Sequence, residues 1–248
     1  MVTDAANKMK YRKACGHDGM FAEALKALLE CTGGADTISK LFTYIFHNSW
    51  WPPHWSALLL TPIHKPNKPT DKSDSYRPIH LSTTLAKLFC MIVDTEIRLT
   101  PLLDDLTPQF GFRAHRGTRD GLFLTRTAIH FAKQHNKPLY VCFIDFKGAF
   151  DRVHRGRLFD HLASIGLHSQ WVSMIKAMYE DVNACLTTHN TTTVFSELGG
   201  VKQGDPLSPL LFILFLEAST NSSTTQSPNH AINSKAKSLH TSSTFTKL

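Results

Sequence analysis

The apolar run from Leu139 to Ile144, which ends at Asp145, constrains the fold more than any other segment of the chain. Pro138 precedes the run and Gly148 follows it, so the run has the length of a β-strand between two chain breakers. We therefore predict a buried strand that ends in a carboxylate. A charge at that position costs desolvation energy unless a cation or hydrogen-bond donors compensate it, which makes Asp145 a candidate metal ligand.

Two residues near this strand have plainer interpretations. Asp151 lies just before the helix that we expect to begin near Arg152, and capping the start of a helix is a common role for Asp. Cys142 lies inside the apolar run, where a small core residue is a better interpretation than a ligand.

Periodic patterns predict most of the remaining secondary structure. Apolar residues at helical spacing predict two helices within 20–47, separated by a turn at 32–34, and further helices over 85–93, 158–165, 171–178 and 210–217. Gly166 is a typical C-terminal stop for the helix over 158–165. Residues 184–195 predict a β-hairpin, and the Pro-rich stretch 62–69 predicts a polar loop.

Motifs on both sides of Asp145 carry the functional information. In chain order they are KACGHDG (13–19), WWPPHW (50–55), PIHK (62–65), YRPIHL (76–81), QFGFR (109–113), DFKGAFD (145–151) and GVKQGDPLSPLLF (200–212). Together, and in this order, they resemble the reverse transcriptase domain of non-LTR retrotransposons. The resemblance covers roughly residues 10 to 217, and several independent motifs in the correct order make it specific.

The resemblance implies a helix-rich α+β fold of the right-hand polymerase type. It places the fingers in residues 1–135 and an incomplete palm, built on a split β-α-β sheet, in residues 136–217. Residues 218–248 are rich in Ser and Thr and contain no acidic residue, so we expect a disordered tail that cannot bury enough surface to offset its ordering entropy.

The resemblance also assigns roles to individual residues. Asp145 matches the catalytic carboxylate that binds two divalent ions, Mg²⁺ or Mn²⁺, and Phe146 matches a residue whose carbonyl binds metal. The family's second carboxylate pair lies on an Ala-Asp-Asp hairpin, and no such motif follows Glu217. We therefore expect no polymerase activity from these 248 residues alone, and we expect the strand over 139–144 to lack its neighbouring strands.

Four residues match the nucleotide site of the family. Arg77, with Lys65 or Lys68, matches the residues that neutralise the triphosphate, and a guanidinium suits phosphate best. Phe150 matches the residue under the sugar that excludes a 2′-hydroxyl, although core packing is an open alternative. Gln203 matches a residue that contacts the incoming nucleotide.

Template contacts are implied farther along the fingers. Arg113, Arg116 and Arg119 match residues that face the template backbone, with surface charge as the alternative for two of them. The family's partners are an RNA template, a DNA primer and a dNTP. The sequence does not indicate an oligomeric state.

Composition narrows the classes of protein. A net charge of +7 and a pI near 9.2 suit a polyanionic partner such as nucleic acid. Five cysteines without a CxxC pair are typical of reduced thiols in an intracellular protein, and scattered histidines argue against a zinc site. No segment has the length of a membrane span or of a signal-peptide core, so we expect a cytoplasmic or nuclear location.

Three functional hypotheses follow. The first is a truncated RNA-directed DNA polymerase, which the motif series favours. The second is a non-catalytic nucleic-acid-binding remnant or scaffold, for which basic charge and the fingers motifs suffice. The third is a metal phosphohydrolase using Asp145; the aspartyl nucleophile pattern needs an acidic residue two positions later, where Lys147 stands.

Overall fold

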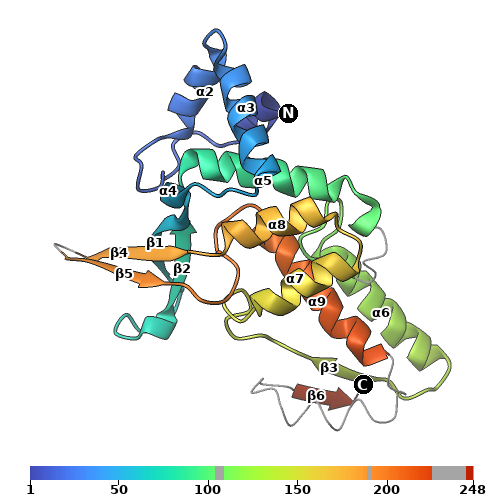
Figure 1. Ribbon diagram of the computed structural model, residues 1–248. Coiled ribbons are helices and arrows are strands. Elements are labelled where there is room, and N and C mark those ends of the chain that lie inside the picture. Colours follow the sequence, from blue (N-terminus) through green and yellow to red (C-terminus); the bar gives the residue numbers. More distant parts are fainter. Residues whose placement is uncertain (104–108, 189–190, 225–243, 248) are drawn as a thin grey trace.

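The computed structural model of the chain describes residues 1–103, 109–188, 191–224 and 244–247 (Figure 1). The helices are α1 Val2–Asn7, α2 Ala22–Glu30, α3 Gly34–His47, α4 Pro53–Ser56, α5 Thr84–Arg98, α6 Thr118–Gln134, α7 Arg155–Ser164, α8 Ser169–Met178 and α9 Ser208–Thr224, with short 3₁₀ turns at Ser73–Ser75 and Pro101–Leu103. The strands are β1 Ala57–His64, β2 Tyr76–Leu81, β3 Tyr140–Phe143, β4 Asn183–Thr188, β5 Thr191–Ser196 and β6 Thr244–Lys247. The predicted helix-rich α+β fold is confirmed.

The helices predicted from periodicity are present, and local signals explain their ends. The turn between α2 and α3 contains Gly33 at φ +79°, a left-handed conformation that suits glycine. Thr83 caps α5 by accepting a hydrogen bond from the Ala86 amide, and Gly166 follows α7 at φ +87°. Gly33 and Gly166 confirm the predicted turn and the predicted helix stop. The Thr83 cap was not predicted, and α5 continues to Arg98, beyond the predicted helix over 85–93.

A four-stranded sheet of order β2-β1-β4-β5 forms one side of the molecule. β1 and β2 pair antiparallel, with Leu59 opposite Leu81 and His64 opposite Tyr76, whereas β1 and β4 pair in parallel. β4 and β5 form the predicted hairpin; its turn, at 189–190, lies outside the described residues. The predicted loop over 62–69 begins later than expected, because residues 62–64 belong to β1.

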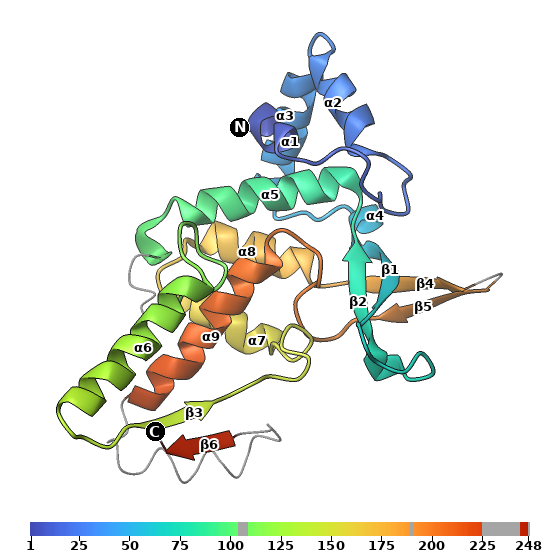
Figure 2. The same ribbon diagram turned by 180° about the vertical axis from the view of Figure 1, so that it is seen from behind.

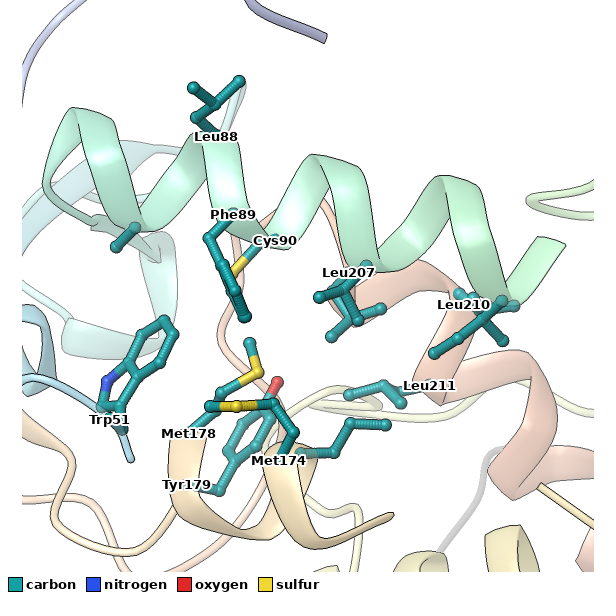
Figure 3. Packing of buried hydrophobic residues seen from close by; sticks show 14 of the residues in the cluster. Trp51, Leu88, Phe89, Cys90, Met174, Met178, Tyr179, Leu207, Leu210 and Leu211 are labelled. Carbon is teal, nitrogen blue, oxygen red and sulfur yellow. The ribbon is translucent and has the colours of Figure 1, made fainter. Parts of the chain in front are cut away.

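The main core lies between α5, α8 and α9 (Figures 1 and 2). Figure 3 shows Phe89 and Cys90 of α5 facing Met174 and Met178 of α8, whereas Leu88 points to the opposite side of α5. On that opposite side α5 contacts α1 and α2. The helix is therefore covered on both sides, which agrees with its many fully buried residues.

The predicted buried strand is present but exposed, so that expectation is wrong. β3 covers Tyr140–Phe143, and Tyr140 and Phe143 are 73% and 62% exposed. β3 pairs only with β6 in a two-stranded sheet separate from the main sheet, and among the described elements no helix packs on it substantially. The predicted core position of Cys142 is wrong for the same reason, since this side chain is exposed.

Other parts of the sequence-based outline remain predictions. The fingers–palm boundary at 135/136 is untested; β1 and β4 come from opposite sides of it and share one sheet. Within the expected disordered tail, residues 218–224 continue α9 and 244–247 form β6, while residues 225–243 and 248 lie outside the described residues.

In the described part of the chain, no helix combines the length and apolarity that crossing a membrane requires.

Candidate functional site

A cavity of about 420 Å³ opens between the β1–β2 hairpin and the segment after β3. It brings together residues from three distant parts of the sequence: the hairpin, the DFKGAFD segment and the turn before α9. Its lining residues are Lys65, Ser73, Asp74, Tyr76, Arg77, Pro78, Lys147, Gly148, Ala149, Phe150, Asp151 and Gln203. Four of the residues that the resemblance assigned to nucleotide binding are in this set.

Three cations line this cavity. Arg77 is exposed on β2, and Lys65 follows β1 and donates a hydrogen bond to the Asp74 carbonyl over 2.7 Å. Lys147 reaches from the opposite side to the Asp74 carboxylate, with 2.6 Å between Nζ and Oδ2. The Lys147 ammonium lowers the pKa of Asp74. Both partners of this ion pair are exposed, so it marks the edge of the cavity and adds little stability.

The Phe150 ring packs against Phe212 and also lines the cavity. Its ring stacks on Phe212 of α9 with centroids 4.9 Å apart and an interplanar angle of 14°, and Phe112 meets it edge-on at 6.1 Å. The half-buried ring also lines the cavity. The two interpretations that the sequence left open are therefore compatible.

The turn that carries Gln203 is joined directly to β2. The His80 amide donates to the Gln203 carbonyl over 2.7 Å. Gly204, at φ +111°, lies so close to the strand that a Cβ atom there would stand 2.8 Å from the His80 carbonyl oxygen. The main chain of Gln203 is thereby held at a fixed position relative to the strand that carries Arg77.

The same turn is joined to the DFKGAFD segment by backbone hydrogen bonds. The Val201 amide donates to the Phe150 carbonyl over 2.9 Å, and the Gly200 amide donates to the Val153 carbonyl over 3.0 Å. Gly200 has φ +76°, and its approach to residues 150 and 151 leaves no space for a side chain. These backbone contacts fix the turn before Gln203 against the segment that carries Phe150.

Two cations hold the loop behind the cavity. Arg155 donates to the carbonyl oxygens of four residues at distances of 2.7–3.0 Å: Tyr179, Glu197, Gly199 and Gly200. Lys202 is buried, donates to the Met178 carbonyl over 2.8 Å and lies 5.3 and 4.9 Å from the ring centroids of Trp51 and Tyr179. Burial lowers the pKa of Lys202. Charge-assisted bonds of this kind are among the stronger ones in proteins.

Asp151 lines the cavity and does not cap a helix, so the predicted capping role is wrong. α7 begins three residues later than expected, and His154 is its N-cap, accepting a hydrogen bond from the Arg157 amide over 3.2 Å. Desolvation by the surrounding chain raises the pKa of Asp151. Asp151 also lines a second cavity, of about 300 Å³, beside the His80–Glu197 pair, in which Nε2 and Oε1 are 2.5 Å apart.

Asp145 and Phe146 stand apart from this arrangement. Both side chains are exposed, and neither residue lines the cavity. Among the described residues, no group of three or more His, Cys, Asp or Glu side chains could hold a metal ion. The described donors therefore do not by themselves fit a divalent metal centre.

Two of the predicted template-binding arginines, Arg113 and Arg116, lie on the segment before α6, and the third, Arg119, is exposed on the first turn of α6. The Arg113 guanidinium donates to the Leu103 carbonyl over 2.8 Å, and the Arg116 side chain is exposed. Neither residue lines the candidate cavity. Their role in template binding stays a prediction.

Sequence reasoning missed Lys147, Asp74 and Arg155 as parts of the site. Lys147 lies inside the DFKGAFD motif, and its charge two residues after Asp145 is a signal that could have identified it. The Lys147–Asp74 contact joins residues 73 positions apart, and Arg155 acts through main-chain carbonyls. No sequence pattern signals contacts of either kind.

Comparison with known proteins agrees with the motif series. A family model described as reverse transcriptase (RNA-dependent DNA polymerase) matches residues 63–235. The chain is 30% identical over 217 residues to a probable RNA-directed DNA polymerase from the transposon X-element of Drosophila melanogaster, covering 86% of this chain and 24% of the relative. It is 29% identical over 222 residues to the RNA-directed DNA polymerase from mobile element jockey of Drosophila funebris, covering 86% and 23%.

A third relative is the Pol polyprotein from the type-1 retrotransposable element R2 of Nasonia vitripennis, 29% identical over 208 residues, with 84% of this chain and 19% of the relative covered. Among solved structures, apo telomerase of Candida tropicalis truncated from its C-terminal domain matches with a TM-score of 0.47 and 13% identity, covering 79% of this chain and 46% of that one. These relatives do not favour a scaffold role over a reverse transcriptase domain. The chain spans about a quarter or less of the length of the curated relatives named here.

Proposed function

This chain belongs to the reverse transcriptase family, and we propose that its 420 Å³ cavity binds the incoming dNTP during RNA-directed DNA synthesis. One observation carries the proposal: Lys65 and Arg77 of the β1–β2 hairpin, Phe150 and Gln203 come from three segments far apart in the sequence and line a single cavity. These are the residue types that a nucleoside triphosphate requires, namely cations for phosphate, a ring for the sugar and an amide for the nucleotide.

Each residue has a separate task in this proposal. Arg77 and Lys65 neutralise the triphosphate, with the planar guanidinium of Arg77 offering paired donors to phosphate oxygens. Phe150, fixed by its stack on Phe212, forms the surface against the sugar. Gln203 contacts the nucleotide from a turn whose backbone is bonded to β2.

The remaining family components are also proposals for this chain. We assign Asp145 and the Phe146 carbonyl as its contribution to a divalent metal site for Mg²⁺ or Mn²⁺, to which other carboxylates must contribute. An RNA template and a DNA primer are the proposed macromolecular partners, with Arg113 and Arg116 against the template backbone. A cytoplasmic or nuclear location is the corresponding proposal for where it acts.

Nucleotide affinity tests the proposal without requiring polymerase activity. Binding of Mg²⁺–dATP to the purified chain is measured by calorimetry for the wild type, Arg77→Ala and the control Arg126→Ala, whose side chain is exposed on α6. Loss of a charge-assisted bond of about 1.5–3 kcal/mol predicts that Arg77→Ala weakens affinity by about 10- to 150-fold. Equal affinities for the two variants would contradict the proposed site.

A further inference from the structure

We propose that a pocket at the α3–α4 loop binds an arginine side chain of a partner polypeptide. The pocket has a volume of about 270 Å³ and lies between this loop and the segment that joins α8 to β4. It shares no lining residue with the 420 Å³ cavity, so it is a separate site and does not depend on the proposed function.

Charge is the first argument for a cationic ligand. The chain has a net charge of +7, yet the charged residues that line this pocket, Glu180 and Asp181, are both acidic. Both side chains are exposed, and neither forms an ion pair with any residue that the structure describes. Neighbouring carboxylates repel each other, and a cation beside them relieves that repulsion. The two carboxylates are therefore available to a cation from outside the chain.

Exposed aromatic rings border the same pocket. Trp50 lines it and is 45% exposed. Tyr44 of α3, which is 59% exposed, meets the Trp50 ring edge-on with centroids 6.2 Å apart. A cation gains free energy from lying over an aromatic face, and tryptophan offers the most favourable one. Rings and carboxylates around one pocket therefore favour a cationic group over a neutral one.

A buried donor without an acceptor points to the same pocket. Trp51 also lines it and is only 8% exposed, and its indole nitrogen has no hydrogen-bond partner among the described residues. Figure 3 shows this nitrogen on the ring edge that faces away from Phe89 and Met178. An unpaired buried N–H group costs free energy. A polypeptide brings main-chain carbonyl oxygens together with its cationic side chains, so it can supply the missing acceptor.

The wall formed by the α3–α4 loop is held against α8. The Gln170 side chain of α8 donates to the Ser49 hydroxyl over 3.1 Å and also to the Phe46 carbonyl. The Trp50 amide donates to the Ile45 carbonyl over 3.1 Å. Trp50 is therefore presented from a loop whose main chain is fixed.

The acidic wall is held by the four-stranded sheet. Asn183, the first residue of β4, pairs with Ala57 of β1, and its side chain accepts a hydrogen bond from the Ser196 hydroxyl over 3.0 Å. The Glu197 amide donates to the Val182 carbonyl over 2.8 Å. Both walls are therefore ordered before a ligand arrives, which lowers the entropy cost of binding.

Arginine fits this arrangement better than other cationic groups. Its planar guanidinium stacks on an aromatic ring and still directs donors to carboxylates, whereas a lysine ammonium acts as a point charge. A nucleic-acid strand also carries flat groups that stack on a ring such as Trp50, but Glu180 and Asp181 would repel its phosphates. The observations therefore favour a polypeptide with exposed arginine.

The test is binding of a fluorescein-labelled peptide to the purified chain, followed by fluorescence anisotropy at low ionic strength. The peptide has eight residues, alternating glycine and arginine. Two matched peptides carry lysine, or the neutral arginine analogue citrulline, in place of arginine. Binding of Mg²⁺–dATP and the thermal midpoint are measured on the same samples, to verify that each variant folds.

Two variants have matched controls. The acidic-pair variant carries Glu180→Gln and Asp181→Asn. Its control carries Glu30→Gln and Asp160→Asn, at exposed positions elsewhere, and has the same net charge.

The aromatic variant is Trp50→Leu. Its control is Phe123→Leu, which replaces a ring that is 70% exposed on α6.

We expect the acidic-pair variant to bind the arginine peptide about 2- to 30-fold more weakly than its control, since exposed ion pairs are individually weak. Loss of the stacking contact in Trp50→Leu should weaken binding by about 2- to 5-fold relative to Phe123→Leu. The arginine peptide should bind more tightly than the lysine peptide, and the citrulline peptide should bind weakly to every variant. Mg²⁺–dATP affinity should be unchanged.

Three results would overturn the proposal. Equal weakening in the acidic-pair variant and its control would show that overall charge, and no particular pocket, attracts the peptide. An arginine peptide that bound no better than its lysine or citrulline counterpart would show that the guanidinium is not recognised. If Trp50→Leu weakened binding of a single-stranded oligouridylate and left binding of the arginine peptide unchanged, the surface would be a stacking platform for nucleic-acid bases.

Discussion

Replacing Gly200 with alanine tests whether backbone packing sets the spacing of the dNTP cavity. Gly200 lies directly against the segment that carries Phe150. A Cβ atom built on it would stand 2.8 Å from the Asp151 Cα atom, and 2.9 Å from the carbonyl oxygens of Asp151 and Phe150. All three neighbours are main-chain atoms, so none can move aside by a change of side-chain rotamer.

The magnitude follows from two separate costs. A non-glycine residue at φ +76° costs about 1–2 kcal/mol, and forcing an additional methyl group into a packed region costs about 1–3 kcal/mol. Their sum predicts a loss of about 2–5 kcal/mol in the free energy of unfolding. For a chain of this size, each kcal/mol corresponds to about 2–4 °C, so the thermal midpoint should fall by about 4–20 °C.

Gly199→Ala is the matched control. It introduces the same methyl group one residue earlier, where no heavy atom lies within 4 Å of the added Cβ. Thermal unfolding followed by circular dichroism gives the stability of both variants, and calorimetry with Mg²⁺–dATP gives their nucleotide affinity. Gly199→Ala should match the wild type within about 1 kcal/mol. Gly200→Ala should lose both stability and affinity.

The reasoning would be refuted if the two alanine variants had the same thermal midpoint. A different pattern would refute only part of it. If Gly200→Ala were strongly destabilised but bound Mg²⁺–dATP normally below its midpoint, the close packing would be confirmed and its role in spacing Phe150 and Gln203 would be wrong.

Three further predictions concern neighbouring residues. Arg155→Ala removes four hydrogen bonds to main-chain carbonyls and should lower the free energy of unfolding, measured by urea titration, by about 3 kcal/mol. The control Arg157→Ala, at an exposed position, should change it by less than about 0.5 kcal/mol. Equal effects of the two substitutions would show that Arg155 does not anchor the loop. The pKa of Asp151 in the folded state is raised above 3.8, so the folded state keeps this proton to higher pH than the unfolded state does. The stability of the wild type relative to Asp151→Asn should therefore be greatest below pH 3.8 and fall as pH rises through the folded pKa. A relative stability that increased with pH over this range would contradict the prediction. Phe150→Val should narrow the difference in affinity between dATP and ATP measured by calorimetry, and an unchanged ratio would leave packing on Phe212 as the ring's only role.

The sequence by itself determined the family and most of the helices. Helical periodicity is a local property, and signals such as the glycine turn at 32–34 and the stop at Gly166 act within a few residues, so they can be recognised without tertiary information. The motifs likewise identified Lys65, Arg77, Phe150 and Gln203, which the structure places around one cavity. Each of these residues has a motif of its own.

Only the tertiary structure decided which residues are buried and which distant charges meet. The apolar composition of β3 indicated a buried strand, yet burial depends on neighbouring elements, and the strand has only β6 beside it among the described residues. The Lys147–Asp74 pair depends in the same way on how separate segments pack. The space around Gly200 is set by main-chain atoms 49 and 50 residues earlier, a distance over which no local pattern carries information.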